Sequence, residues 1–526
     1  MKKNLLLEIY SEEIPSLQQE IAVNNLCKNI KNALYKNKFY NSRCACFFTP
    51  RRISIYLNRI DRKTKNSIKI VRGPKIFSLK ESIEGFKKKF HIKSRNLYVR
   101  NGYYYYNLTV KLKPVVIILK DVIEDVLENF SWIKSMKWGN MKTKWIRPIL
   151  SILCLFDNKI LPINFGHLTA ANKTFCNWMV DFKSYQVISF IDYYKLLSNG
   201  NIILKQQKRI NIIRNKISSL TKSFNLLNDN CLLKEVANLI EYPVITIGKI
   251  NKKFMSLPHK IIVYTLKYHQ KYLMLKDDDN NLLPKFVIII NYNTQDKLKT
   301  VILGNEKVLE SRLKDIKFFI NEDRKKSLRS KLYQLKNVTY HNKIGSYIEK
   351  LIVMKKIVEN LSIQFNFNIK KSLDSLNIIK NDLLTKTVQE LPFLQGVIGY
   401  YYALLDNEDR DVALTVKDHY MPQGPTDIVP NNNLSIIIAL SDKITSLNLL
   451  FKIGIRSSGS KDPFALRRCA IGIIRIICIN NLNISIKHFI LYDVFKFISI
   501  RLKNIKNSRI KINSNFLLYI TEFIDL

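Results

Sequence analysis

The chain has 526 residues, a length that predicts roughly three or four domains. Its residues are 47% hydrophobic and 11% aromatic, and this composition excludes a disordered chain. Lysine and arginine number 86 against 42 aspartates and glutamates, which gives a formal net charge of +44. This charge favours polyanionic partners, nucleic acid first, although the abundance of Lys, Asn, Ile and Tyr indicates that compositional drift contributes part of it.

No targeting or membrane segment is predicted. The N-terminus stops being apolar after three leucines, and the longest apolar runs, 115–119 and 149–156, fall short of the ~20 residues that a membrane helix needs. The eight cysteines are scattered, and Cys44 and Cys46 have no second Cys or His pair at zinc spacing. We therefore expect a cytoplasmic protein with reduced thiols, no structural metal and no membrane partner.

The first 60 residues combine strand and helix patterns. Short apolar runs predict strands at 5–10, 44–48 and 53–60, and a longer amphipathic run predicts a helix at 16–36. Arg51 and Arg52 stand at the start of the third strand, where guanidinium groups can fork onto phosphate. An exposed strand start without a ligand explains them equally well.

Further cations lie near turns. Arg72 and Lys75 flank a Gly-Pro turn, which is a weak phosphate-loop pattern. Residues 96–110 then predict a hairpin with a type I′ turn at Asn101-Gly102, and 115–130 predict a helix.

Tryptophans alternate with cations before an expected strand at 149–156. Trp138 and Arg147 suit stacking on bases or on the end of an RNA helix. The same residues can instead cover a joint between domains, and that alternative stays open.

The middle of the chain predicts helices at 206–222 and 232–240, a strand at 241–245 and a hairpin at 272–291. Before that hairpin, a helix ends in Tyr264-Thr-Leu-Lys-Tyr-His-Gln-Lys-Tyr272. Its Lys267 and Lys271 alternate with aromatic and amide groups, a pattern suited to gripping a nucleic-acid backbone and stacking exposed bases.

Residues 304–326 predict an amphipathic helix with a buried leucine and isoleucine stripe. Gly304-Asn305 is expected to be the turn before it, with peptide N–H groups that could hold a phosphate or bond to water. Lys307, Lys314 and Lys317 form a basic edge on another face. Lys307 and Arg312 are candidate contacts on this helix, and an ordinary surface helix is the alternative.

Beyond about residue 330 only helical patterns follow, at 344–361, 373–390, 395–405, 434–451, 465–479 and 489–502. We therefore expect an α+β protein with a mixed α/β N-terminal body and an all-helical region after it. The expected domains are 1–175, 176–330, 331–480 and a short helical remnant at 481–526.

Short motifs recur in order along the chain and carry a resemblance to a known family. They are Glu8-Ile-Tyr-Ser-Glu-Glu-Ile-Pro15, Thr49-Pro-Arg-Arg52, Arg72-Gly-Pro74, Lys137-Trp-Gly139, Arg147-Pro148, Glu235-Val-Ala237, Glu241-Tyr-Pro-Val244, Gly304-Asn-Glu-Lys307, Leu394-Gln-Gly396 and residues 457–468. With these motifs the chain resembles the beta subunit of the bacterial two-subunit glycine-tRNA ligase. The end of the chain departs from that family, because a further helical domain suited to reading the anticodon arm is expected after Arg468.

The resemblance implies a tRNA-binding subunit that works with a separate alpha subunit in an α2β2-like complex. In this family the alpha subunit holds ATP, with Mg²⁺, and glycine, so no cofactor is expected on this chain, and no Gly-rich phosphate loop is present. The residues that we expect to contact tRNA(Gly) are Arg51, Arg52, Arg72, Lys75, Trp138, Arg147, Lys267, Lys271, Lys307, Arg312, Arg467 and Arg468.

The family also contains a helical domain that looks like an HD phosphohydrolase domain. Asn381-Asp382 stands where its His-Asp pair would be, Asp442 could be the distant carboxylate, and His341 could be the first ligand. Because an amide is a poor substitute for an imidazole, we expect a retired metal site. A metal-dependent phosphohydrolase and a general RNA-binding scaffold remain the alternative functions.

Overall fold

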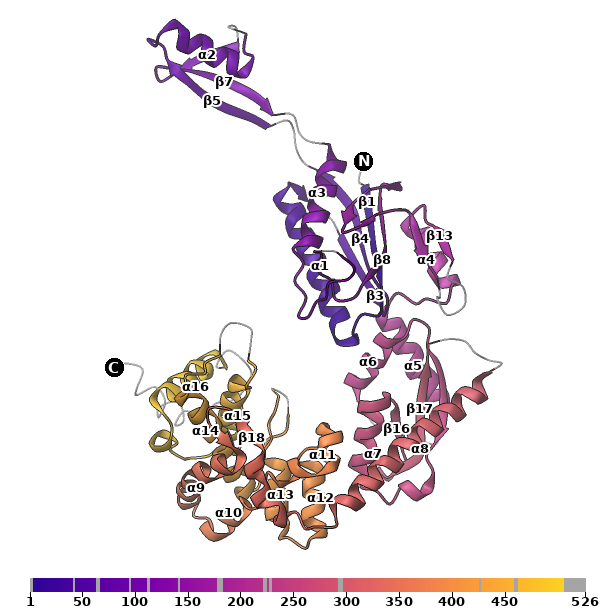
Figure 1. Ribbon diagram of the computed structural model, residues 1–526. Coiled ribbons are helices and arrows are strands. Elements are labelled where there is room, and N and C mark those ends of the chain that lie inside the picture. Colours follow the sequence, from indigo (N-terminus) through magenta and orange to yellow (C-terminus); the bar gives the residue numbers. More distant parts are fainter. Residues whose placement is uncertain are drawn as a thin grey trace. The chain divides into compact units, whose positions relative to one another are not determined.

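The computed structural model (Figure 1) groups the chain into two compact units. Unit 1 contains Met1–Gly248 and Leu275–Ile302, and unit 2 contains Lys249–Met274 and Leu303–Leu526. The residues that the structure describes are 3–40, 43–62, 67–93, 96–110, 114–140, 142–176, 183–220, 225–226, 229–291, 297–424, 427–457 and 462–505. The predicted α+β class is confirmed, while the finer domain limits stay predictions.

Unit 1 is built on an antiparallel sheet with the order β2-β4-β1-β8-β9, in which β3 also pairs with β4. Its strands are β1 (Lys3–Ser11), β2 (Phe39–Tyr40), β3 (Arg43–Thr49), β4 (Arg52–Arg62), β8 (Ile149–Phe156) and β9 (Lys159–Ile160). The expected strands at the N-terminus and at 149–156 are confirmed.

Helices cover both faces of this sheet, which is why β1 is apolar at consecutive positions. Leu5, Leu7 and Ile9 face the core shared with α1 (Ser16–Lys36) and α3 (Val115–Glu128). Leu6 points the other way, because side chains alternate along a strand, and joins the core beside α4 (Phe190–Asn199). Figure 1 shows α1 and α3 on one side of the sheet and α4 on the other.

A small three-stranded sheet, in the order β5-β7-β6, lies between β4 and α3 in the sequence. Its elements are β5 (Ser67–Lys75), α2 (Lys80–Phe90), β6 (Leu97–Arg100) and β7 (Tyr103–Val110). The turn between β6 and β7 is the predicted Asn101-Gly102, with positive φ angles of 49° and 76° at its two residues, as a type I′ turn requires.

Short pairs and a four-stranded sheet follow. The pairs are β10 (Asn164–Phe165) with β11 (Leu168–Thr169) and β12 (Lys173–Phe175) with β13 (Ser184–Gln186). The sheet has the order β14-β16-β17-β15, with strands at Asn225–Leu226, Leu273–Lys276, Leu282–Ile290 and Val244–Lys249. Two helices, α5 (Gln206–Leu220) before β14 and α6 (Asn230–Leu239) after it, are close to their predicted bounds.

The helix predicted at 304–326 begins earlier than expected. α8 runs over Leu298–Asp323, so Gly304 and Asn305 lie inside it and not in a turn before it. The prediction of a phosphate-binding turn at these residues is therefore wrong, because N–H groups inside a helix bond to the carbonyls one turn back. The predicted apolar stripe is confirmed: Leu309, Leu313 and Ile316 are buried.

After α8, the described residues of unit 2 are helical except for a small hairpin of β18 (Thr339–His341) and β19 (Gly345–Ser346), which the expected all-helical pattern missed. Its α-helices are α9 (Tyr347–Gln364), α10 (Ile369–Ser375), α11 (Lys386–Glu390), α12 (Val397–Leu405), α13 (Arg410–Asp418), α14 (Asn433–Lys452), α15 (Leu466–Ile479) and α16 (Tyr492–Ile505). Shorter helical turns are η5 (Arg329–Asn337), η6 (Asn381–Leu384), η7 (Pro392–Leu394) and η8 (Lys487–Phe489).

One described helix, α14, has the length and hydropathy of a membrane span. The protein buries 89% of its most apolar window, and Leu440, Ile444 and Leu447 lie in the core of the helical bundle. The composition of α14 is thus that of a central core helix.

The oxidation state of two cysteines differs from the sequence prediction. Cys27 on α1 and Cys44 on β3 are joined by a disulfide, so the expectation that every thiol is reduced is wrong for this pair. The pairing was missed because α1 brings Cys27 onto β3 from 17 residues upstream.

Candidate nucleic-acid interface

Arg52 lies at the centre of a buried polar network in unit 1. Its Nη1 lies 3.3 Å from Glu8 Oε2, and its Nε lies 3.2 Å from Glu241 Oε1. Both of its Nη atoms donate to the Phe175 carbonyl at 3.1 Å. Burial alone would lower the pKa of Arg52, but the Glu241 and Glu8 charges outweigh it and raise the pKa.

Hydroxyl groups complete this network. Thr49 Oγ1 donates to Glu241 Oε1 at 2.6 Å, Thr174 Oγ1 donates to Glu8 Oε1 at 2.6 Å, and Tyr193 also donates to Glu8. The network therefore joins three stretches of the sequence whose motifs carried the family resemblance.

The predicted role of Arg52 as a tRNA contact is corrected by its burial. The side chain has no exposed surface, so it has none to offer a phosphate. Arg51 is only 9% exposed and forms an ion pair with Glu12. The motif at residues 49–52 thus holds unit 1 together and does not form an exposed RNA surface.

Arg72 and Lys75 are exposed on the small three-stranded sheet. The Arg72 guanidinium lies 4.4 Å from the Tyr103 ring centre, and the Lys75 ammonium lies 5.9 Å from it. The structure therefore places two cations beside a tyrosine, but in strand β5 and not in the Gly-Pro turn that the sequence predicted, because residues 67–75 pair with β7, with an irregularity between Arg72 and Lys75.

Trp138 and Arg147 have different surroundings. Trp138 is half-buried and packs against the core of the main sheet. Arg147 is exposed, and its Nη1 donates to the Ile146 carbonyl at 3.1 Å. Only Arg147 of this pair presents a charged group to solvent.

An aromatic stack with cations beside it forms the best-defined candidate surface in unit 2. The Tyr264 and Tyr268 rings stack with centres 5.5 Å apart, and Phe393 stacks on Tyr268 at 5.0 Å. Tyr264 lies in the last turn of α7 (His259–Thr265), and Tyr268 lies in the π-helical turn η3 (Leu266–Gln270). Tyr268 is 43% exposed, so one ring of the stack is open to solvent.

The predicted cations Lys267 and Lys271 flank this stack. Their ammonium groups lie 5.5 and 6.0 Å from the Tyr268 ring centre. We call Tyr264, Tyr268, Phe393, Lys267 and Lys271 the aromatic platform. Aromatic rings with adjacent cations are the groups that bind single-stranded nucleic acid, because every base has a face that can stack.

Arg312 of α8 lies near the platform, because His269 contacts the Phe393 ring. Arg312 lines a cavity of about 120 Å³ together with His269 of η3 and Glu390 of α11. Burial and the Arg312 charge both lower the pKa of His269. Lys307 is exposed one and a half turns earlier on α8, while the neighbouring Asn305 accepts a hydrogen bond from the Tyr272 hydroxyl.

Arg467 and Arg468 lie in the first turn of α15. Asp462 accepts hydrogen bonds from the backbone N–H groups of Leu466 and Arg467 at 2.8 and 3.0 Å. Arg467 is half-buried and Arg468 is exposed. Residues 458–461 of the same motif lie outside the described residues.

Asp442 of the HD-like region is neutralised by lysines. Lys350 Nζ and Lys380 Nζ lie 2.8 and 3.2 Å from its Oδ1, and both side chains are almost fully buried. Burial would raise the pKa of Asp442, but the two charges hold it well below its usual range. Burial lowers the pKa of Lys380 to about 8. The Asp442 carboxylate opposes this effect, but the Lys350 charge beside the same carboxylate lowers the pKa further.

The other HD-like residues are engaged within the protein. Asn381 donates to the Leu328 and Asn377 carbonyls, and Asp382 accepts from the Gly396 N–H. His341 accepts from the Lys343 N–H at 3.1 Å. Within the described part of the chain, these side chains do not form a group of three or more metal-ligating residues; the group found there is Cys27, Cys44 and Cys46.

Comparison with known proteins decides the family. The model of the glycyl-tRNA synthetase beta subunit family matches residues 5–522. The chain belongs to this family. It is 37% identical to the glycine-tRNA ligase beta subunits of Rickettsia canadensis and Rickettsia prowazekii, over 93% and 94% of this chain and 73% and 74% of theirs. It is equally similar to that of Rickettsia bellii, over 92% of the chain and 74% of the relative.

Membership in the beta subunit family makes the chain a ligase subunit of the aminoacyl-tRNA synthetase class. Sequence reasoning found the cations of the aromatic platform but missed Phe393, which lies 125 residues from Tyr268 in the chain. It also missed Lys350 and Lys380, since a lysine in an amphipathic pattern is expected on the surface. The only local signal for Phe393 was its position just before the Leu394-Gln-Gly396 motif.

Proposed function

We propose that this chain is the tRNA-holding subunit of a glycine-tRNA ligase. Its family membership carries the proposal, because the relatives matched over nine-tenths of the chain are glycine-tRNA ligase beta subunits. The net charge of +44 and the aromatic platform support binding of an RNA.

The proposed complex contains a separate alpha subunit in an α2β2-like assembly in the cytoplasm. The alpha subunit binds ATP, Mg²⁺ and glycine and forms the adenylate, and the beta chain binds none of these cofactors. The beta chain holds tRNA(Gly) so that its terminal ribose hydroxyl meets the adenylate. Holding two reactants in line can lower the activation barrier by about 7–11 kcal/mol without any bond chemistry in the holding subunit.

The structural surroundings of Asp442 weigh against the alternative of a metal-dependent phosphohydrolase. Two lysine ammonium groups lie at the carboxylate that a metal would need, and Asn381 uses its amide on backbone carbonyls. A cation that is part of the chain replaces the charge that a metal ion would supply.

The test is glycine charging of tRNA(Gly) by this chain alone, by an alpha subunit alone and by both mixed. We expect charging only in the mixture, while ATP–pyrophosphate exchange with glycine needs the alpha subunit. Charging by the beta chain alone, or no gain on mixing, would contradict the proposal. Phosphatase activity that disappears in Asp382→Ala would favour the phosphohydrolase instead.

A further inference from the structure

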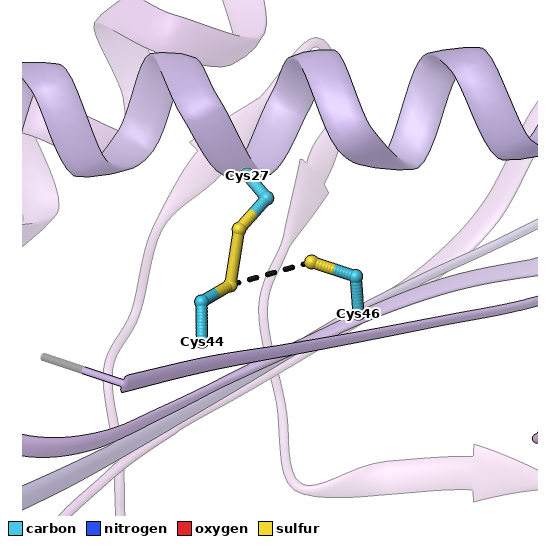
Figure 2. Close-up of side chains that lie close together, drawn as sticks. All are labelled: Cys27, Cys44 and Cys46. Carbon is cyan, nitrogen blue, oxygen red and sulfur yellow. Dashed lines mark hydrogen bonds between the residues drawn. A yellow bond between two sulfur atoms is a disulfide. The ribbon is translucent and has the colours of Figure 1, made fainter.

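Three cysteine thiols meet at the contact between α1 and β3. Cys27 lies on the inner face of α1, and Cys44 and Cys46 lie two residues apart on β3, so both point from the same face of the strand toward the helix (Figure 2). The three Sγ atoms all lie within 4.8 Å of one another, and those of Cys44 and Cys46 are 3.3 Å apart.

The cluster is placed by rigid elements. Cys27 is 6% exposed and belongs to the core of the main sheet, and Cys44 and Cys46 are half-buried against that core. A helix packed on a sheet holds the Cβ positions of the three residues whether or not two of the sulfurs are bonded. The approach of the thiols is therefore a property of the fold.

We propose that the reduced Cys27, Cys44 and Cys46 side chains bind one zinc ion through their three thiolates. Zinc has Zn–S distances of ~2.3 Å in tetrahedral sites, which puts two ligand sulfurs ~3.8 Å apart. The 3.3 Å between the Cys44 and Cys46 sulfurs is close to that spacing. Water or another small ligand completes the fourth position.

A cation lies near the cluster, because the Lys31 charge acts on Cys46. Three thiolates and Zn²⁺ carry a net charge of −1, which the same lysine, one turn after Cys27, helps to balance. Zinc binding ties α1 to β3.

Oxidation and metal binding exclude each other at this cluster. In the disulfide that the structure contains, Cys27 and Cys44 share a bond and cannot both act as thiolate ligands. Reduction by a phosphine adds two electrons and two protons, breaks this S–S bond and gives two thiols. Zinc then displaces the protons of the three thiols. This inference is independent of the proposed function.

The test uses the full chain reduced with a phosphine, freed of reductant under inert gas and titrated with Co²⁺ as a spectroscopic probe of zinc sites. We expect one equivalent to bind, with the thiolate charge-transfer and visible bands of tetrahedral cobalt, and Zn²⁺ to displace it. The oxidised chain should show none of these bands. Zinc should also raise the thermal unfolding temperature of the reduced chain.

Two variants distinguish metal binding at this cluster from binding by other cysteines. Cys46→Ser removes the third thiol but leaves the Cys27–Cys44 disulfide able to form, so it should fold and bind at least tenfold more weakly. Cys231→Ser changes an exposed cysteine outside the cluster and should bind like the wild type. Absence of cobalt bands in the reduced wild type, or equal binding by Cys46→Ser, would overturn the inference.

Discussion

At the residue scale, Arg52 compensates two buried carboxylates, and its loss leaves both without a cation. Glu8 is fully buried and Glu241 is 4% exposed. We expect Arg52→Ala to lower the free energy of unfolding by about 3–5 kcal/mol, because removing one partner of a buried ion pair strands the other charges. Urea unfolding followed by circular dichroism measures this loss.

The neighbouring arginine provides the control for Arg52. Arg51 pairs with Glu12, whose side chain is 45% exposed, so water can solvate the carboxylate when the arginine is removed. Arg51→Ala should cost about 1 kcal/mol or less. If Arg52→Ala were as stable as Arg51→Ala but lost tRNA binding, the structural role of Arg52 would be refuted.

Asp382 gives the HD-like region a defined dependence of stability on pH. Burial raises the pKa of its carboxyl from 3.8 to about 6 in the folded chain. The folded state therefore holds this proton more tightly than the unfolded state does. The stabilisation is fully present below pH 3.8, and it is lost as the pH rises through about 6. The difference of about two pKa units corresponds to at most about 3 kcal/mol.

The variant Asp382→Asn tests this dependence, because it removes the charge and keeps an acceptor for the Gly396 N–H. Relative to the wild type, its free energy of unfolding should rise by up to about 3 kcal/mol between pH 4 and pH 7. A parallel pH profile for the two proteins would show that Asp382 does not titrate in this range.

At the scale of elements, the aromatic platform depends on the contact of η3 with η7. If bases of the tRNA stack on it, Tyr268→Ala should remove about 1–3 kcal/mol per stacked base, or roughly 5- to 150-fold in kcat/KM for tRNA. ATP–pyrophosphate exchange by the complex should not change. Tyr333→Ala removes a tyrosine that is 80% exposed outside the platform and should leave charging unaltered.

The same elements show what the sequence could and could not predict. α1 has its predicted bounds because one amphipathic pattern after Pro15 specifies it, and the Asn101-Gly102 turn follows from local backbone preferences. The start of α8 was missed because a glycine inside a helix resembles a helix boundary. Local patterns thus predicted the helices and strands, but not every residue at which they begin or end.

Long-range contacts were beyond sequence reasoning. Arg52 was expected to face RNA because its partners, Glu8 and Glu241, lie 44 and 189 residues away. Cys27 and Cys44, and likewise Tyr268 and Phe393, meet only through packing of separate elements. Residue type and local spacing identify a cation, whereas the fold decides whether that cation faces solvent, a carboxylate or a ring.

At the scale of the whole molecule, the salt dependence of binding shows how much of the net charge of +44 contacts tRNA. Each phosphate neutralised by a lysine or arginine releases counterions, so the logarithm of the binding constant should fall linearly and steeply with the logarithm of salt concentration. Filter binding of tRNA(Gly) to the assembled complex at several salt concentrations gives the slope. A flat response would mean that the charge is compositional drift.

Single variants measure how much each lysine contributes to that slope. If Lys307 on α8 contacts a phosphate, Lys307→Ala should reduce its magnitude by about one, because one fewer counterion is released on binding. Lys36→Ala removes an exposed lysine at the end of α1 in unit 1 and should leave the slope unchanged. Equal reductions by both variants would indicate a diffuse electrostatic attraction, since a defined binding surface requires the position of a lysine to matter as well as its charge.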